Sequence, residues 1–214
     1  MESMAMKLRH LTALILAFAG TLCSAQDSGL SLGFEQSNTQ VRVNGSKYSG
    51  DLNGLKLSGR MGLAQRFSVH FDYTTGSGTV TAGDTKDAAY TEYAVHVSYG
   101  FGHAGEGADD PAHPYFIGLG YLSKDLDFDG VAYKEENFPL FLGANFALSD
   151  RVGLRVMGFA PVDKIQNNRA ADIQLSVAMG KRSKVIAGYT NYSSKLAHIR
   201  QCGSGFELSY QIDF

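Results

Sequence analysis

Residues 125–136 read Asp-Leu-Asp-Phe-Asp-Gly-Val-Ala-Tyr-Lys-Glu-Glu, a spacing of oxygen ligands that could bind calcium. Three carboxylates at alternate positions, a glycine for the turn and a closing glutamate match the calcium-loop pattern D-x-D-x-D-G-x5-E. The candidate ligands are Asp125, Asp127, Asp129 and Glu136. However, strand-like segments and not helices flank this loop, and Ala132 stands where such loops carry a branched apolar residue. The alternative is an extended hairpin with a two-residue turn at Asp129-Gly130.

Two histidines, His70 and His96, form a second candidate site. The link between their two segments is centred near residue 83, so an antiparallel hairpin would place them directly opposite each other. Two facing imidazoles could share a metal ion or transfer a proton. We favour the alternative that both belong to a packed polar interior, because buried charges and polar groups have to be paired. The pairs expected there are Arg60 with Asp72 and Lys56 with Glu92.

Two further groups of residues carry weaker signals. His103, Asp109, Asp110 and His113 could form a transition-metal site, although a solvated acidic loop accounts for them better. Tyr192, Ser193, Ser194 and His198 hold the residue types of a serine/histidine hydrolase. No nucleophile elbow or paired-carboxylate motif accompanies them. The sequence therefore predicts no catalytic residues and no cofactor, apart from the calcium loop.

The elements that position these residues repeat with a period of two, which is typical of β-strands. At the C-terminus, Phe206, Leu208, Tyr210, Ile212 and Phe214 alternate with polar residues. About ten such segments are expected: 30–34, 55–63, 67–73, 93–101, 115–121, 140–148, 152–156, 173–179, 185–189 and 206–214. Short links alternate with longer polar links at 44–53, 76–89, 125–136, 161–171 and 193–203.

Two opposite faces on each strand predict a transmembrane barrel. The mean hydropathy of −0.13 reads as soluble, but averaging hides an apolar face that can meet lipid and a small or polar face that can line a lumen. The polar face is expected to include Lys56, Arg60, His70, Asp72, Glu92, His96, Asn145, Arg155, Gln174, Glu207 and Gln211. A soluble β-sandwich or lipocalin-like barrel is the rival. It is disfavoured because the polar face is poor in lysine and glutamate and because aromatic residues gather near strand ends.

The N-terminus predicts export. Lys7 and Arg9 precede an apolar stretch, and Cys23-Ser24-Ala25 supplies the small residues of a cleavage site. Residues 1–25 are therefore expected to be a signal peptide, with Met6 a better initiator than Met1, and residues 26–214 a single barrel domain. Cys202 would be the one cysteine left, which excludes an internal disulfide. A formal net charge of −2 gives no basic footprint for nucleic acid.

The last ten residues, Gly-Phe-Glu-Leu-Ser-Tyr-Gln-Ile-Asp-Phe, resemble the terminal strand of bacterial outer-membrane proteins. Together with the signal peptide and the alternation, the chain is similar in architecture to small barrels of the OmpX/Ail and OmpA-transmembrane type. The resemblance implies an antiparallel up-and-down barrel in the outer membrane. It also implies recognition of Phe214 by the barrel-assembly machinery, contact with outer-membrane lipids and lipopolysaccharide, and a monomeric state. Those barrels have eight strands, so we expect eight to ten here.

Composition and pattern leave three functions open. The leading expectation is a structural or surface-interaction protein that presents its long polar loops outside the cell. The alternatives are a narrow porin-like channel for small solutes and an outer-membrane lipid-modifying enzyme.

Overall fold

The computed structural model describes residues 28–64, 66–102, 114–161, 169–196 and 199–214. The expected signal peptide at 1–25 lies outside the described residues. So do His103, Asp109, Asp110 and His113 of the weak metal cluster, and His198. None of the described residues forms a helix long and apolar enough to cross a membrane.

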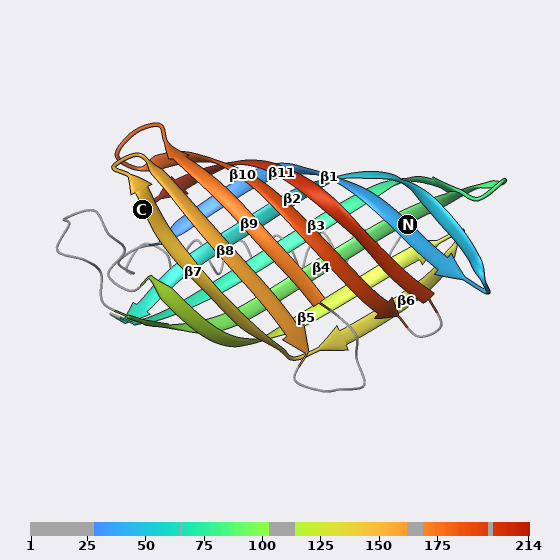
Figure 1. Ribbon diagram of the computed structural model, residues 1–214, viewed down its shortest axis with the longest axis horizontal. Helices are drawn as coiled ribbons and strands as arrows, with labels where there is room; N and C mark the ends of the chain where they lie inside the picture. Colours follow the sequence, from blue (N-terminus) through green and yellow to red (C-terminus); the bar gives the residue numbers. More distant parts are fainter. Residues whose placement is uncertain (1–27, 65, 103–113, 162–168, 197–198) are drawn as a thin grey trace, which may run out of the picture.

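The described chain consists of antiparallel strands joined in sequence order (Figure 1). The segments are β1 (Gly29–Val43), β2 (Ser46–Ala64), β3 (Phe67–Thr81), β4 (Thr85–Phe101), β5 (Tyr115–Phe128), β6 (Val131–Asn137), β7 (Pro139–Ser149), β8 (Val152–Pro161), β9 (Arg169–Ala178), β10 (Ser183–Leu196) and β11 (Ile199–Asp213).

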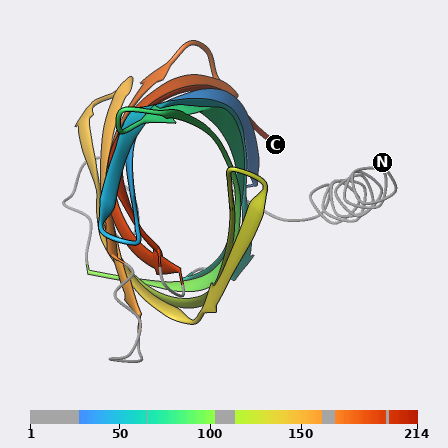
Figure 2. The same cartoon turned by 90° about the vertical axis from the view of Figure 1, so that its right-hand side faces the viewer.

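Pairing of β1 with β11 and of β4 with β5 closes the sheet into a barrel, and Figure 2 shows the closed wall end-on. Both β6 and β7 pair with β5, so they are the two halves of one strand that is interrupted at Phe138. The interruption lies beside Pro139, which has no N–H to donate to the ladder. The barrel therefore has ten strands, which confirms the expected all-β, up-and-down transmembrane fold and selects ten strands over eight.

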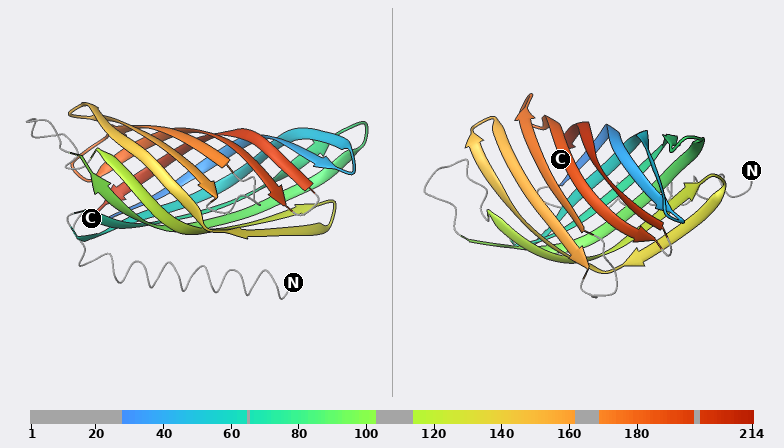
Figure 3. Two further views of the ribbon diagram at one scale, coloured as in Figure 1. Left: turned by 60° about the horizontal axis from the view of Figure 1, so that its bottom comes forward. Right: turned by 45° about the vertical axis from the view of Figure 1, so that its right-hand side comes forward.

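One zone of the barrel has an apolar outer face. On β11, the outward residues Phe206, Leu208 and Tyr210 are 66%, 61% and 49% exposed, whereas the inward residues Glu207 and Ser209 are buried. The same parity holds on the paired strands, because directly paired residues point to the same side of a sheet. Such a continuous band of exposed Leu, Ile, Val and Phe is stable only against lipid. We call this band the lipid belt; Figure 3 shows the tilted strands that carry it.

Several strands are longer than a membrane crossing requires. β8 and β9 have 10 residues each, which suffices for a tilted crossing. β2 has 19 residues and β4 has 17, and their hairpins extend beyond the ends of β8 and β9 in Figure 1. The expectation of long polar links at 44–53, 76–89 and 125–136 was therefore wrong. These segments continue the strands to tight turns.

Glycine and its preceding residue form two of those turns. Asn44 and Gly45 have φ values of 49° and 85°, and Asp129 and Gly130 have values of 54° and 79°. Positive φ at both central residues is the requirement of a type I′ hairpin turn, whose twist matches that of the flanking strands. The hairpin alternative for residues 125–136 is thus the conformation observed.

Candidate functional site

The lumen is the candidate site, and its wall is polar at the level of the lipid belt. A cavity of about 250 Å³ lies inside the barrel. Ten of the eleven expected lumen residues line it: Lys56, Arg60, His70, Asp72, Glu92, Asn145, Arg155, Gln174, Glu207 and Gln211. The eleventh, His96, is buried, and its direct pairing with His70 places it on the same inner face. The alternation of polar and apolar residues along each strand therefore identified the inner face of the barrel correctly.

The cavity wall carries balanced charge. Its basic residues are Lys56, Arg60, Lys124, Arg155 and Lys184, and its acidic residues are Glu35, Asp72, Glu92, Asp172 and Glu207. Glu35, Lys124, Asp172 and Lys184 were missed by the sequence analysis because they lie at or beyond the ends of the expected strands. Five positive and five negative groups give the cavity wall no net formal charge, so its overall charge favours neither cations nor anions.

Two ion pairs join side chains on the inner face of the barrel wall. Lys56 Nζ lies 2.7 Å from Glu207 Oε2, and Lys124 Nζ lies 3.1 Å from Glu92 Oε2. These pairs differ from the expected ones, since Glu92 pairs with Lys124 and not with Lys56. The expected Arg60–Asp72 pair is not among the ion pairs formed by the described residues. The charges are nevertheless matched within the barrel, as a packed polar interior requires.

The two histidines lie directly opposite each other, as the hairpin arithmetic predicted. Their rings are parallel, with centroids 4.6 Å apart and planes 3° apart, and His96 also stacks on Phe141 at 4.2 Å. Because the lone pairs of imidazole lie in the ring plane, stacked rings do not direct their nitrogens at one ion. Among the described residues no group of three or more His, Cys, Asp or Glu could hold a metal. The packing interpretation of this pair fits the geometry.

The residues of the expected calcium loop spread along the β5–β6 hairpin. Lys86 Nζ contacts Asp129 Oδ2 at 2.8 Å, Lys134 Nζ contacts Glu136 Oε1 at 2.5 Å, and the Gly130 amide donates to Asp127 Oδ1 at 3.0 Å. Asp125 lies directly opposite Lys134. Because Asp129 is at the turn and Glu136 is seven residues further on, their Cα atoms are roughly 20 Å apart along the strand. Calcium binding by these four residues would require the hairpin to rearrange.

The hydroxyl-bearing residues near the end of β10 have partners of their own. The Tyr192 hydroxyl lies 2.6 Å from Thr39 Oγ1. Ser194 Oγ donates to Glu135 Oε2 at 3.1 Å, which joins β10 to β6. These contacts tie neighbouring parts of the barrel together beyond the lipid belt.

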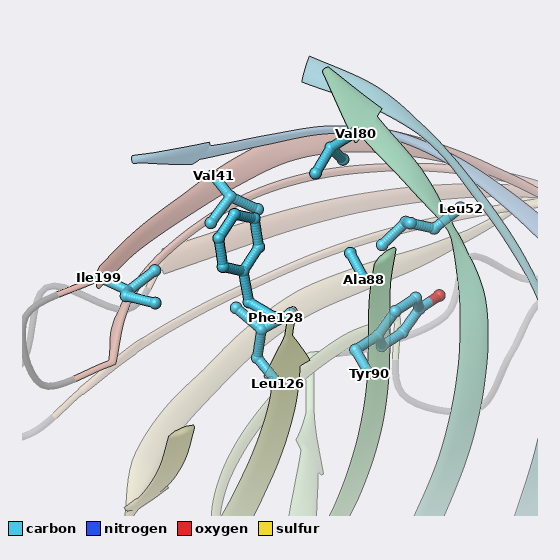
Figure 4. Packing of buried hydrophobic residues seen from close by; sticks show 8 residues of the cluster. All are labelled: Val41, Leu52, Val80, Ala88, Tyr90, Leu126, Phe128 and Ile199. Atoms are coloured by element: carbon cyan, nitrogen blue, oxygen red, sulfur yellow. The ribbon is translucent and has the colours of Figure 1, made fainter. Parts of the chain in front are cut away.

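A cluster of apolar side chains fills the barrel beyond the polar cavity, on the side of the long hairpins (Figure 4). We call it the apolar plug; it consists of Val41, Leu52, Val80, Ala88, Tyr90, Leu126, Phe128 and Ile199. Their exposed fractions lie between 0% and 6%. They come from six strands, and their pairing places them on the same inner face as the lumen residues.

The plug packs against the polar cavity without a break. The Tyr90 hydroxyl donates to Glu35 Oε1 at 3.3 Å, so one ring belongs to the plug while its oxygen faces the cavity. Gly76 lies directly opposite Tyr90, and a Cβ there would come within 2.6 Å of the Tyr90 ring. The glycine therefore makes room for the aromatic ring in the plug. Tyr48 packs edge-on against Phe128 at 5.1 Å and extends the plug toward the hairpin tips.

The sequence analysis missed the plug, although a signal was present. On β1 the apolar residues are even-numbered from Leu30 to Phe34 and odd-numbered from Val41 to Val43. On β5 they change from odd-numbered up to Tyr121 to even-numbered from Leu122 to Phe128. A change of parity within one strand means that the apolar face has moved from the outside of the barrel to the inside.

Comparison with solved structures places the fold among bacterial outer-membrane barrels. The chain is similar to the outer-membrane protease OmpT from Escherichia coli, with 11% identity, a TM-score of 0.57 and coverage of 89% of this chain and 98% of the other. It is also similar to the translocator domain of the autotransporter NalP from Neisseria meningitidis, with 12% identity, a TM-score of 0.55 and coverage of 100% and 98%. No protein-family model and no curated sequence matches the chain.

The lipid belt, the closed barrel and these similarities define an integral β-barrel protein of the Gram-negative outer membrane. At identities this low, the structural similarity shows the fold alone. The specific role has to come from the chain's own residues.

Proposed function

We propose that this protein is a closed outer-membrane barrel that anchors a rigid interaction surface outside the cell. The apolar plug carries this proposal. A channel for ions or small polar solutes needs a continuous polar path, and burying a hydrated ion among apolar side chains is costly. Eight buried apolar residues between the cavity and the hairpin tips oppose conduction.

The same plug gives the projecting hairpins a core. An isolated two-stranded hairpin is only marginally stable in water, whereas strands that share an apolar core are stable. β1–β2, β3–β4 and β5–β6 each contribute side chains to the plug. The outer faces of these hairpins are thereby held in a fixed arrangement, which suits recognition better than a set of independent loops would.

Planar-bilayer conductance tests the proposal. We expect the wild-type barrel to be silent after insertion into the bilayer. A variant that combines Leu52→Ala, Leu126→Ala and Phe128→Ala should show ion current, because it truncates three of the eight plug side chains and leaves the polar cavity intact. The matched control combines Leu55→Ala, Leu119→Ala and Phe206→Ala on the lipid-facing side, where the side chains are 58%, 61% and 66% exposed; it should stay silent. Discrete current steps from the wild-type protein would refute the closed barrel and favour the channel alternative.

A further inference from the structure

Four basic residues stand in one row on the outside of the barrel, beyond the lipid belt. Arg42 on β1 lies directly opposite Lys47 on β2 and opposite Arg200 on β11. Arg200 in turn lies opposite Lys195 on β10. All four side chains are exposed. We call this set the basic row.

The basic row is outward-facing by parity. Its neighbours along the strands, Val41 and Ile199, are plug residues that point into the barrel, and alternate residues of a strand point to opposite sides. Adjacent strands are about 4.8 Å apart, so four strands place four positive charges within about 14 Å.

Such a row is unfavourable for the protein alone. Like charges on directly opposite residues destabilise a sheet. Among the described residues, no carboxylate lies within ion-pair distance of Arg42, Lys47 or Arg200. The chain as a whole has a formal net charge of −2, so general basicity does not explain the row. An anionic partner that lies across the strands would.

The position of the row indicates the source of that partner. Arg200 precedes the lipid-belt residue Phe206 by six residues, which corresponds to about 20 Å along the strand and about 15 Å along the membrane normal at a typical barrel tilt. A side wall at this height faces the saccharide layer of the surrounding outer leaflet. Between the row and the belt, the outer face carries uncharged hydrogen-bonding groups that suit sugar hydroxyls: Asn38, Gln40, Asn191, Ser193 and Ser204. It also carries one carboxylate, Asp51 on β2, which accepts a hydrogen bond from Asn38 Nδ2 at 2.9 Å.

The opposite side of the projecting hairpins carries acidic groups and no comparable row. Asp87 and Asp127 are exposed on β4 and β5. Charge is thus divided around the barrel wall, and an anionic partner is attracted to one side only.

We propose that the basic row binds the phosphorylated core sugars of lipopolysaccharide in the same membrane. This inference rests on the proposed function, because it requires the barrel to be inserted with its long hairpins outside. It assigns the β10–β11–β1–β2 face as the contact with the lipid head group. Arginine and lysine supply the charge-assisted hydrogen bonds that phosphate groups accept.

The test uses the folded full-length barrel domain in neutral detergent micelles. Binding of purified rough lipopolysaccharide with a phosphorylated core is compared for the wild type and for a variant with Arg42→Ser, Lys47→Ser and Arg200→Ser. A basic side chain near an anionic surface strengthens binding by roughly fivefold, so losing three should weaken it on the order of 100-fold. The matched control removes three exposed basic residues at the opposite end of the barrel, with Arg151→Ser, Lys181→Ser and Arg182→Ser; it should bind like the wild type.

Two further measurements keep folding defects separate from lost contacts. Without lipopolysaccharide, the basic-row variant should melt at or above the wild-type temperature, because it loses like-charge repulsion. Dephosphorylated lipopolysaccharide should bind the wild type as weakly as the intact form binds the variant. Equal affinity of the variant and the wild type for intact lipopolysaccharide would overturn the proposal. A variant that loses binding to soluble heparin but still binds lipopolysaccharide would also overturn the proposal. That result would assign the row to a polyanion from outside the membrane. Failure to insert into bilayers would instead refute the proposed function.

Discussion

Replacing Leu126 by alanine tests whether the apolar plug stabilises the part of the barrel outside the membrane. Leu126 is 0% exposed and packs in the plug from β5. Removing three carbon atoms costs about 2 kcal/mol in transfer free energy. The cavity left among rigid strands adds about 1–2 kcal/mol, because it is not refilled. We therefore expect Leu126→Ala to lower the free energy of unfolding by about 3–4 kcal/mol.

Leu119→Ala is the matched control on the same strand. Leu119 is 61% exposed on the lipid belt, so lipid or detergent fills the space that the leucine leaves. The cavity contribution disappears, and the expected loss is at most about 2 kcal/mol. Both variants can be compared by urea unfolding in lipid vesicles. Tyrosine fluorescence can follow the transition, because the chain has 11 tyrosines and no tryptophan.

Hydrogen exchange shows where the loss occurs. In Leu126→Ala, the amides of β1–β2 and β3–β4 near Val41 and Val80 should exchange faster, because these strands share the plug with β5. In Leu119→Ala those amides should keep their protection. Equal losses of unfolding free energy in the two variants, with unchanged exchange near Val41, would show that the plug contributes no specific packing and would refute the reasoning.

Three further outcomes follow from the lumen, the C-terminus and the β5–β6 hairpin. Lys56→Met should lower the free energy of unfolding by about 3–5 kcal/mol, because it leaves the Glu207 carboxylate buried without its ion-pair partner. Lys56→Met combined with Glu207→Met should recover most of that loss. Equal losses for the single and the double variant in urea unfolding would contradict this reasoning. Phe214→Ser should reduce the amount of folded protein in the outer membrane, measured by heat-modifiable gel migration. Refolding in detergent should stay normal, because Phe214 is 58% exposed. Impaired refolding in detergent would show that Phe214 acts in folding and not in recognition. Millimolar Ca²⁺ should leave the melting temperature unchanged because the hairpin separates the carboxylates; a rise that Asp127→Asn abolishes would establish the calcium loop instead.

The registers of the hairpins were predictable from local features. The link between β3 and β4 has its centre at Gly83, and this alone places His70 opposite His96. The same reasoning gave the Asp129–Gly130 turn as one of two alternatives. The other alternative was a calcium loop. The same residue pattern fits a calcium loop and a hairpin turn, so only the pairing of the flanking strands decided between them. The partners of the lumen charges could not be predicted, because strands remote in sequence supply them. Lys56 on β2 finds Glu207 on β11 only once β1 has paired with both strands.

The sequence by itself determined that the chain forms antiparallel strands with one lipid-facing and one inward-facing side, because a period of two is a property of each strand alone. It also contained the reversal of apolar parity on β1 and β5. Only closure of the ten strands decided that the apolar side chains after this reversal meet one another inside the barrel. The strands differ in length, with 10 residues in β8 and 19 in β2. The longer strands therefore continue beyond the point where the shorter ones leave the membrane. Beyond that height water replaces lipid outside the barrel, so the apolar side chains turn inward and form the plug.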